Sequence, residues 1–272
     1  MRKLYVSDLD GTLLTSQSNL SSKTISIING LIEQGMHFTF ATARSISSAS
    51  KIVQGLHLNI PMVVYNGAFI IDPIHHTPIY SQFFSDVESK QLLDTLLSFA
   101  QYPFVYAYID GVERVSYLPS KLHEGGHHYL LQREHDKRFR PVEHIEELYD
   151  GNIFYMTCIH EGVFLQEVYD KICTYPFTNT IFQQELYREE YWLEMMPIQA
   201  SKAYAIQALK EMGKYDQVIT FGDAINDLPM FAISDACYAV ENALPQLKEK
   251  ATGVISNHNQ DAVALWLQEH FD

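Results

Sequence analysis

The segment Asp8-Leu9-Asp10-Gly11-Thr12-Leu13 decides the fold that this sequence predicts. It directly follows Leu4-Tyr5-Val6, a short apolar run that predicts a β-strand. Two carboxylates therefore stand at the end of a strand, which is where open α/β sheets bind their ligands. Asp and Gly also favour turns, so turn chemistry is the better explanation of this segment taken alone. The rest of the chain has to distinguish the two interpretations.

Outward from this segment, short apolar runs alternate with stretches of helical periodicity. Before residue 66 we predict strands at 4–6, 38–41 and 62–65, with helices at 25–32 and 45–56 between them. After Pro197 we predict helices at 201–212, 228–233, 245–251 and 261–271, and strands at 217–221, 237–240 and 254–255. This alternation predicts an α/β fold with a doubly wound parallel sheet, similar to a Rossmann fold.

The middle of the chain has a different pattern. Two β-rich runs at 104–109 and 112–118 flank Asp110-Gly111, a dipeptide that favours a hairpin. We also predict helices near 87–97 and 163–172, and strands at 153–159, 180–186 and 191–195. Such a segment predicts an inserted α+β domain with an antiparallel sheet. We therefore expect a discontinuous core domain, 1–82 with 196–272, and an inserted domain at 83–195.

The composition limits the classes of partner. The chain has 272 residues, 47% of them hydrophobic, and 19 basic against 33 acidic side chains give a net charge of −14. Nucleic acid and anionic membranes are disfavoured as partners, because phosphate backbones demand clustered Lys and Arg. The three cysteines form no C-x-x-C pair, and no apolar run approaches the roughly 18 residues of a membrane span. We expect a cytoplasmic protein.

A second acidic cluster favours the functional interpretation of the first. Gly222-Asp223-Ala224-Ile225-Asn226-Asp227 follows the predicted strand at 217–221. Thr42 ends another predicted strand, and Lys202 begins a predicted helix. In a doubly wound sheet these positions can converge on one edge. Carboxylates, a hydroxyl and an ammonium group together suit a hard cation and an anionic ligand.

These motifs occur in the same order as the signatures of haloacid dehalogenase-type phosphatases, and the chain resembles the Cof-like branch that carries an α/β cap of type IIB. The motifs are D-x-D-G-T at 8–12, Thr42, Lys202 and G-D-x-x-N-D at 222–227, and the resemblance extends over essentially the whole chain. Asn66-Gly67-Ala68 matches the family's usual N-G-A. Thr42-Ala43-Arg44, Lys202-Ala203 and Glu241-Asn242-Ala243 depart from the family at one residue each.

The resemblance implies a role for each matching residue. Asp8 would be the nucleophile that forms an aspartyl-phosphate, and Asp10 the general acid and then the general base. Mg²⁺ is the implied cofactor, held by the side chains of Asp8 and Asp223 and the backbone carbonyl of Asp10. The implied phosphate-binding residues are Thr42, Ala43, Lys202 and Asn226, and the implied supporting residues are Gly11, Thr12, Arg44, Asn66 and Asp227.

The implied function is a magnesium-dependent phosphatase of small phosphorylated metabolites, with sugar phosphates, flavin mononucleotide and pyridoxal phosphate all open as substrates. Two alternatives stay open: a phosphotransferase or phosphomutase that uses the same aspartyl-phosphate, and a catalytically idle relative that binds a ligand. Tyrosines and histidines of the inserted cap are the candidates for recognition of the leaving group. The oligomeric state is not predicted.

One further motif lies in the insert. His123-Glu124-Gly125-Gly126-His127 matches the H-E-x-x-H pattern of zinc proteases, which needs both histidines on one face of a stable helix. Two adjacent glycines cost such a helix roughly 1 kcal/mol each. We therefore expect a solvated loop here, and incidental metal binding by these histidines stays open.

Overall fold

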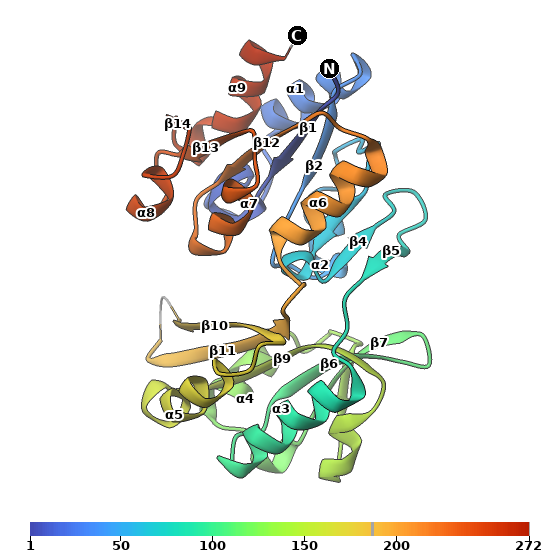
Figure 1. Cartoon of the computed structure of the whole chain (residues 1–272), viewed down its shortest axis with the longest axis vertical. Coiled ribbons are helices and arrows are strands. Elements are labelled where there is room, and N and C mark those ends of the chain that lie inside the picture. Colours follow the sequence, from blue (N-terminus) through green and yellow to red (C-terminus); the bar gives the residue numbers. More distant parts are fainter. Residues whose placement is uncertain (186–187, 272) are drawn as a thin grey trace. The chain divides into compact units, whose positions relative to one another are not determined.

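The computed structural model describes residues 1–185 and 188–271, and the chain divides into two compact units (Figure 1). The core unit consists of Met1–Ser81 and Ala200–Asp272, and the cap unit of Gln82–Gln199. The sequence had suggested an insert at 83–195. Among the described residues, no helix combines the length and the apolar character that crossing a membrane requires.

The core unit contains a five-stranded parallel sheet with the strand order β14-β13-β12-β1-β2. The strands are β1 (Lys3–Ser7), β2 (His37–Phe40), β12 (Gln217–Gly222), β13 (Ala236–Val240) and β14 (Gly253–Ile255). Strand β1, which lies between β12 and β2, is almost wholly buried, as expected of a parallel sheet covered by helices. The predicted doubly wound parallel sheet is confirmed. Strand β1 pairs directly with β12, which follows the insert in the sequence.

The helices of the core unit are α1 (Ser22–Glu33), α2 (Ile46–Ile52), α6 (Lys202–Gly213), α7 (Leu228–Ala232), α8 (Pro245–Lys248) and α9 (Ala262–His270). Helix α1 begins at a serine cap, because the Ser21 side chain accepts a hydrogen bond from the Thr24 N–H. Its apolar side chains recur at helical spacing and are buried. Helix α1 packs against α9, and α6 packs against α7 (Figure 1).

The third predicted strand, at 62–65, forms but belongs mainly to another sheet. Strand β3 (Met62–Val64) pairs antiparallel with β4 (Phe69–Ile71), which pairs with β5 (Pro78–Ser81). Its link to the parallel sheet is a single bridge between Ala41 and Val63. We did not predict β4 and β5, although Asn66-Gly67 in the turn that reverses the chain after β3 is a dipeptide that favours a hairpin.

The cap unit contains a six-stranded sheet with the order β10-β11-β9-β6-β7-β8. The strands are β6 (Phe104–Ile109), β7 (Val112–Tyr117), β8 (Phe139–Pro141), β9 (Asn152–Glu161), β10 (Thr178–Gln184) and β11 (Glu190–Pro197). Neighbours pair antiparallel, as predicted, except for the parallel pair β7–β8. The sequence analysis did not predict β8, and Leu186, its predicted end of the strand at 180–186, lies outside the described residues.

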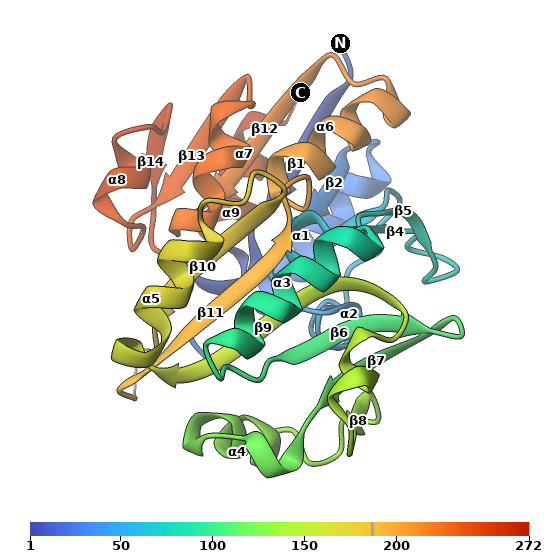
Figure 2. The ribbon, with the colours of Figure 1, turned by 60° about the horizontal axis from the view of Figure 1, so that its bottom comes forward.

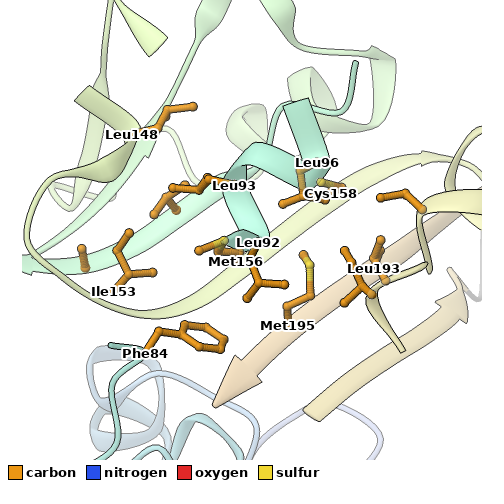
Figure 3. Packing of buried hydrophobic residues seen from close by; sticks show 14 of the residues in the cluster. Phe84, Leu92, Leu93, Leu96, Leu148, Ile153, Met156, Cys158, Leu193 and Met195 are labelled. Atoms are coloured by element: carbon orange, nitrogen blue, oxygen red, sulfur yellow. The ribbon is translucent and has the colours of Figure 1, made fainter. Parts of the chain in front are cut away.

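The cap unit has a hydrophobic core of its own. Helices α3 (Asp86–Ser98) and α5 (Gly162–Ile172) contact each other and cover one face of this sheet (Figure 2). Figure 3 shows leucines of α3 packed against β9 and β11; the cluster includes Leu92, Leu93, Leu96, Ile153, Met156, Leu165, Val168, Leu193 and Met195. Short 3₁₀ turns at Pro119–Lys121 and Ile145–Tyr149 complete this unit, and another at His258–Gln260 lies in the core unit.

The prediction of a solvated loop at His123-Glu124-Gly125-Gly126-His127 is wrong, because helix α4 (Glu124–Leu131) begins there. Both glycines are buried, and a Cβ on Gly125 would lie 2.6 Å from Ile159 Cγ2. The glycines thus allow α4 to lie close to β9, and this packing overrides their low helix propensity. His123 is the cap residue of α4 and stacks on His160, with ring centroids 3.6 Å apart.

Candidate active site

The first acidic motif forms a kinked helical turn, Leu9–Leu13, directly after β1. The Asp8 N–H still donates to the carbonyl of Phe221 at 2.9 Å, so β12 holds the residue that begins the motif. Gly11 has a φ of +77°, and a Cβ at this position would lie 2.3 Å from Asp223 Oδ2. Glycine is therefore required both for the turn and for the close approach of the second acidic motif.

A buried lysine lies between two carboxylates at the centre of the site. Lys202 Nζ donates to Asp8 Oδ1 at 2.5 Å and to Asp227 Oδ1 at 2.7 Å. The exposed fractions are 1% for Lys202, 5% for Asp8 and 0% for Asp227. Lys202 is the first residue of α6, and the side chain of Ser201 caps that helix by accepting from the Tyr204 N–H. The carboxylates raise the pKa of Lys202, although burial opposes them.

Asp227 has both carboxylate oxygens engaged. Its Oδ1 accepts from Lys202, and its Oδ2 accepts from the backbone N–H groups of Asp223 at 2.9 Å and Ala224 at 3.0 Å. Gly222 allows this arrangement, because a Cβ there would lie 2.7 Å from Asp227 Oδ2. Asp227 therefore positions both the second acidic loop and the lysine.

Three carboxylates meet in this site. Ligand atoms of Asp8, Asp223 and Asp227 lie within 4.8 Å of one another, so the cluster could hold a metal ion. Together with Lys202 they leave a formal charge of −2 when all are ionised. Burial raises the pKa of Asp8 to about 8 against the influence of Lys202, and burial raises the pKa of Asp223 to about 6. A divalent cation would relieve this crowding of negative charge.

Of the three residues that the sequence predicts as metal ligands, only two bring their side chains together. Asp8 and Asp223 come together, and Thr12 Oγ1 donates to Asp223 Oδ1 at 2.9 Å. The carboxylate of Asp10 instead faces Arg44, whose Nε and Nη2 each donate to one of its oxygens at 2.6 Å. This bidentate pair raises the pKa of Arg44.

The predicted phosphate-binding residues lie on neighbouring loops. Thr42 is buried, and its Oγ1 accepts from the Arg44 N–H at 3.1 Å. Asn226 Nδ2 donates to Asn66 Oδ1 at 3.1 Å, and the Asn66 N–H donates to the carbonyl of Thr42 at 2.9 Å. Ala43 is exposed on the same loop as Thr42.

The sequence analysis did not assign a role to Asn242, which the structure places at the site. Asn242 Nδ2 donates to the carbonyl of Gly11 at 2.8 Å, and its Oδ1 accepts from the His258 N–H at 3.2 Å. It thereby anchors the turn that carries the first acidic motif. Its position just after β13, at the same edge of the sheet as the other motifs, was the available signal.

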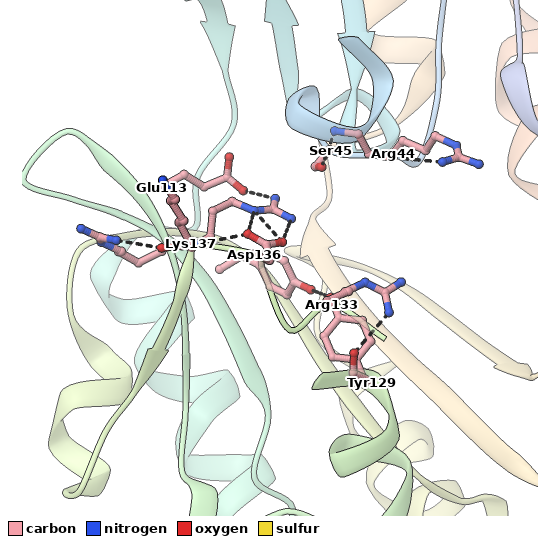
Figure 4. A network of polar contacts seen from close by, with 11 residues as sticks. Arg44, Ser45, Glu113, Tyr129, Arg133, Asp136 and Lys137 are labelled. Carbon is pink, nitrogen blue, oxygen red and sulfur yellow. Dashed lines mark hydrogen bonds and ion pairs between the residues drawn. The ribbon is translucent and has the colours of Figure 1, made fainter. Parts of the chain in front are cut away.

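The cap unit carries a separate set of polar side chains. Arg138 donates to Glu113 at 2.6 Å and also donates to both carboxylate oxygens of Asp136 (Figure 4). The hydrogen bonds from Arg138 hold the pKa of Asp136 below its usual range. The Arg133 guanidinium lies 4.1 Å from the centroid of the Tyr129 ring. Tyr106 on β6 is hydrogen-bonded to Tyr129 on α4, and the Tyr155 hydroxyl on β9 donates to Glu194 on β11. Burial raises the pKa of Glu194.

A doubly wound sheet whose carboxyl edge carries a carboxylate cluster around a buried lysine is characteristic of enzymes that transfer phosphoryl groups with a metal ion. Comparison with known proteins defines the class further: residues 5–267 match the model of the haloacid dehalogenase-like hydrolase family. The chain belongs to this family.

Individual relatives are similar over the whole chain. A Haemophilus influenzae protein with the provisional name of phosphatase is 27% identical and is matched over 100% of this chain and 99% of its own. The 5-amino-6-(5-phospho-D-ribitylamino)uracil phosphatase YwtE of Bacillus subtilis is 25% identical over 98% of this chain and 97% of its own. A crystal structure of a Thermotoga maritima protein has a TM-score of 0.80 at 24% identity, with 100% and 98% covered.

A further solved structure has a similar fold over the whole chain. A structure described as a haloacid dehalogenase subclass IIB sugar phosphatase has a TM-score of 0.75 at 17% identity, and 99% of this chain is covered. The predicted membership in the Cof-like phosphatase branch is confirmed, and with it the assignment to the phosphoric monoester hydrolases.

Proposed function

We propose that this hydrolase is a magnesium-dependent phosphatase that releases phosphate from small phosphorylated metabolites through a covalent intermediate on Asp8. The observation that supports it best is the buried contact of Lys202 with Asp8 and Asp227, next to Asp223. Among the described residues Lys202 is the hydrogen-bond partner of the Asp8 carboxylate, through Oδ1. The other oxygen of Asp8 is therefore the one that we assign to attack.

The first step would proceed as follows. An oxygen of Asp8 attacks phosphorus, the ester P–O bond breaks, and the leaving alkoxide takes a proton from Asp10. The Lys202 ammonium reduces the repulsion between the attacking carboxylate and the phosphoryl oxygens. The Thr42 hydroxyl and Asn226 amide would supply hydrogen bonds to the phosphoryl group from their loops.

The second step would restore the enzyme. Asp10, now a carboxylate, accepts a proton from water, and the resulting hydroxide attacks phosphorus. The bond between phosphorus and Asp8 breaks, and inorganic phosphate leaves. Arg44 orients Asp10 through its bidentate pair, and one of these two hydrogen bonds has to open before Asp10 acts on the leaving group or on the water.

The donor set fits a magnesium ion. The crowded, buried carboxylates offer hard oxygen ligands and an excess of negative charge. We assign the side chains of Asp8 and Asp223 and the backbone carbonyl of Asp10 as ligands, and exclude Asp227 because its oxygens already accept from Lys202 and two backbone N–H groups. When bound, the ion would neutralise negative charge on the phosphoryl oxygens.

A small metabolite is the substrate class that the observations favour. One relative is named for a ribitylaminouracil phosphate, and a structural neighbour for sugar phosphates. The net charge of −14 disfavours nucleic acid. The tyrosines and histidines of the cap unit are the candidates for recognition of the leaving group.

Phosphate release from p-nitrophenyl phosphate tests the proposal. We expect activity with Mg²⁺ and its loss on chelation, and we expect Asp8→Asn to lower kcat by roughly 10³-fold or more because the nucleophile is lost. Asp216→Asn is the matched control: Asp216 directly precedes β12, at the end of that strand opposite the site. Full activity of Asp8→Asn would rule out the assigned nucleophile. Phosphorus NMR would reveal transfer to a hydroxyl instead of water.

A further inference from the structure

The turn between β3 and β4 has an unusual backbone. Tyr65, Asn66 and Gly67 follow one another with φ values of 50°, 51° and 100°. Glycine and asparagine adopt this left-handed region readily, but an aromatic residue rarely does. Such a conformation persists only where the surrounding structure holds it, and it is often found at functional sites. The contacts of the turn show what holds it.

The turn supports the loop that carries Thr42 and Arg44. The Asn66 N–H donates to the carbonyl of Thr42 at 2.9 Å, and the Tyr65 N–H donates to the carbonyl of Arg44 at 3.0 Å. These two bonds fix the backbone on both sides of Ala43. The position of the Thr42 hydroxyl and the direction in which the Arg44 side chain leaves the loop therefore depend on this turn.

The same turn also contacts the start of α6 and the second acidic loop. A Cβ on Gly67 would lie 2.2 Å from the carbonyl oxygen of Ser201 and 3.0 Å from the backbone nitrogen of Lys202. Asn66 is 6% exposed, and its Oδ1 accepts from Asn226 Nδ2 at 3.1 Å. One turn of three residues thus meets three of the loops that carry the site.

We propose that the left-handed turn Tyr65–Gly67 is the positioning element of the active site, and that Asn66 is its positioning residue. The left-handed backbone directs the N–H groups of Tyr65 and Asn66 to one loop, while the Asn66 side chain reaches Asn226 and Gly67 leaves room for the start of α6. This inference rests on the proposed phosphatase function, because the groups that it aligns are those assigned to the phosphoryl group.

The sharpest test is Asn66→Gly. Glycine keeps the positive φ without strain and removes only the side chain that Asn226 contacts. We expect kcat/KM for p-nitrophenyl phosphate to fall about tenfold or more, mainly through kcat, because transition-state interactions are sensitive to small misplacements. Inhibition by orthovanadate, which mimics the phosphoryl group in transfer, should weaken by a similar factor. The thermal unfolding midpoint should stay close to that of the wild type.

Gly67→Ala provides a second test with a matched control. Gly35 has a φ of 101°, nearly that of Gly67, but a Cβ there would meet nothing within 4 Å. Gly35→Ala thus imposes the same backbone strain in the core unit without the contact to α6. We expect Gly67→Ala to lose activity and weaken vanadate inhibition, and Gly35→Ala to retain both.

A double-mutant cycle with Asn226→Ala tests whether Asn66 acts through its contact with Asn226. If Asn66 acts through Asn226, Asn66→Gly combined with Asn226→Ala should lose no more activity than the more damaging single change. Fully additive losses would overturn this role of Asn66. If the wild type hydrolyses the ester and Asn66→Gly keeps an activity within about twofold of the wild type, the positioning inference is overturned while the proposed function stands. A wild-type chain that hydrolyses no phosphate ester would overturn the proposed function, and this inference with it.

Discussion

Asp8 couples its protonation to folding, since it is buried beside two other carboxylates and its pKa is raised to about 8. A carboxyl group with a higher pKa in the folded than in the unfolded chain stabilises the fold at low pH, and this contribution is lost as the pH rises through the folded value. With chelator present, we expect the thermal unfolding midpoint of the wild type to fall relative to that of Asp8→Asn between about pH 4 and about pH 8. A pH-independent difference would contradict this, and Mg²⁺ should reduce the fall.

Residue by residue, the sequence was informative about which loops meet and less so about where side chains point. The residues after β1 and β12 and at the start of α6 could be predicted to share one edge, because parallel strands end together. The pairing of Asp10 with Arg44 could not, since it depends on side-chain rotamers. Asn242 was missed because an Asn after a strand is, by itself, ordinary turn chemistry.

Substitution by alanine should change the stability of the chain in opposite directions at two glycines that lie in helices. A Cβ on Gly30, inside α1, meets nothing within 4 Å, so Gly30→Ala should stabilise the chain by about 0.5–1 kcal/mol. A Cβ on Gly125, inside α4, would lie 2.6 Å from Ile159 Cγ2, so Gly125→Ala should destabilise it despite the better helix propensity. Urea unfolding measures both changes. Stabilisation by Gly125→Ala would contradict the close packing of α4 on β9.

The elements with regular apolar periodicity were predicted, and those set by packing or by backbone conformation were not. The parallel strands and most helices follow their apolar runs, with shifts of a few residues at the ends. Helix α4 was missed because its two glycines suggest a loop, and only burial against β9 explains them. Strands β4 and β5 were missed because Asn66-Gly67, a hairpin dipeptide, was assigned only to a sequence motif, and because Tyr65 before it is a residue that seldom adopts a positive φ.

At the scale of the whole molecule, each unit has its own hydrophobic core, so damage to one should remain local. Leu193 is fully buried in the cluster between the cap sheet and its helices. Leu193→Ala should cost about 2–5 kcal/mol and speed hydrogen exchange in peptides of Gln82–Gln199. Peptides of the core unit should keep their protection, and Mg²⁺ binding should persist. Equal loss of protection in both units would contradict independent cores.

The insertion itself was visible in the sequence, because the alternating pattern stops near Phe83 and resumes after Pro197. The structure shows two compact units, with the cap unit at Gln82–Gln199. The last residues of β11 and the segment that follows had no periodicity to locate them, so the second boundary was the harder one to place.

The strand order of the core sheet has a consequence for synthesis on the ribosome. Strand β1 needs β12 as its neighbour, yet Gln82–Gln199 are translated between them. The emerging chain therefore completes the contiguous cap unit while β1 still lacks β12 on one side, since contacts distant in sequence close late. During that interval the apolar β1 is an unpaired edge exposed to chaperones and to other nascent chains. Only the emergence of β12 from the ribosome ends this vulnerability.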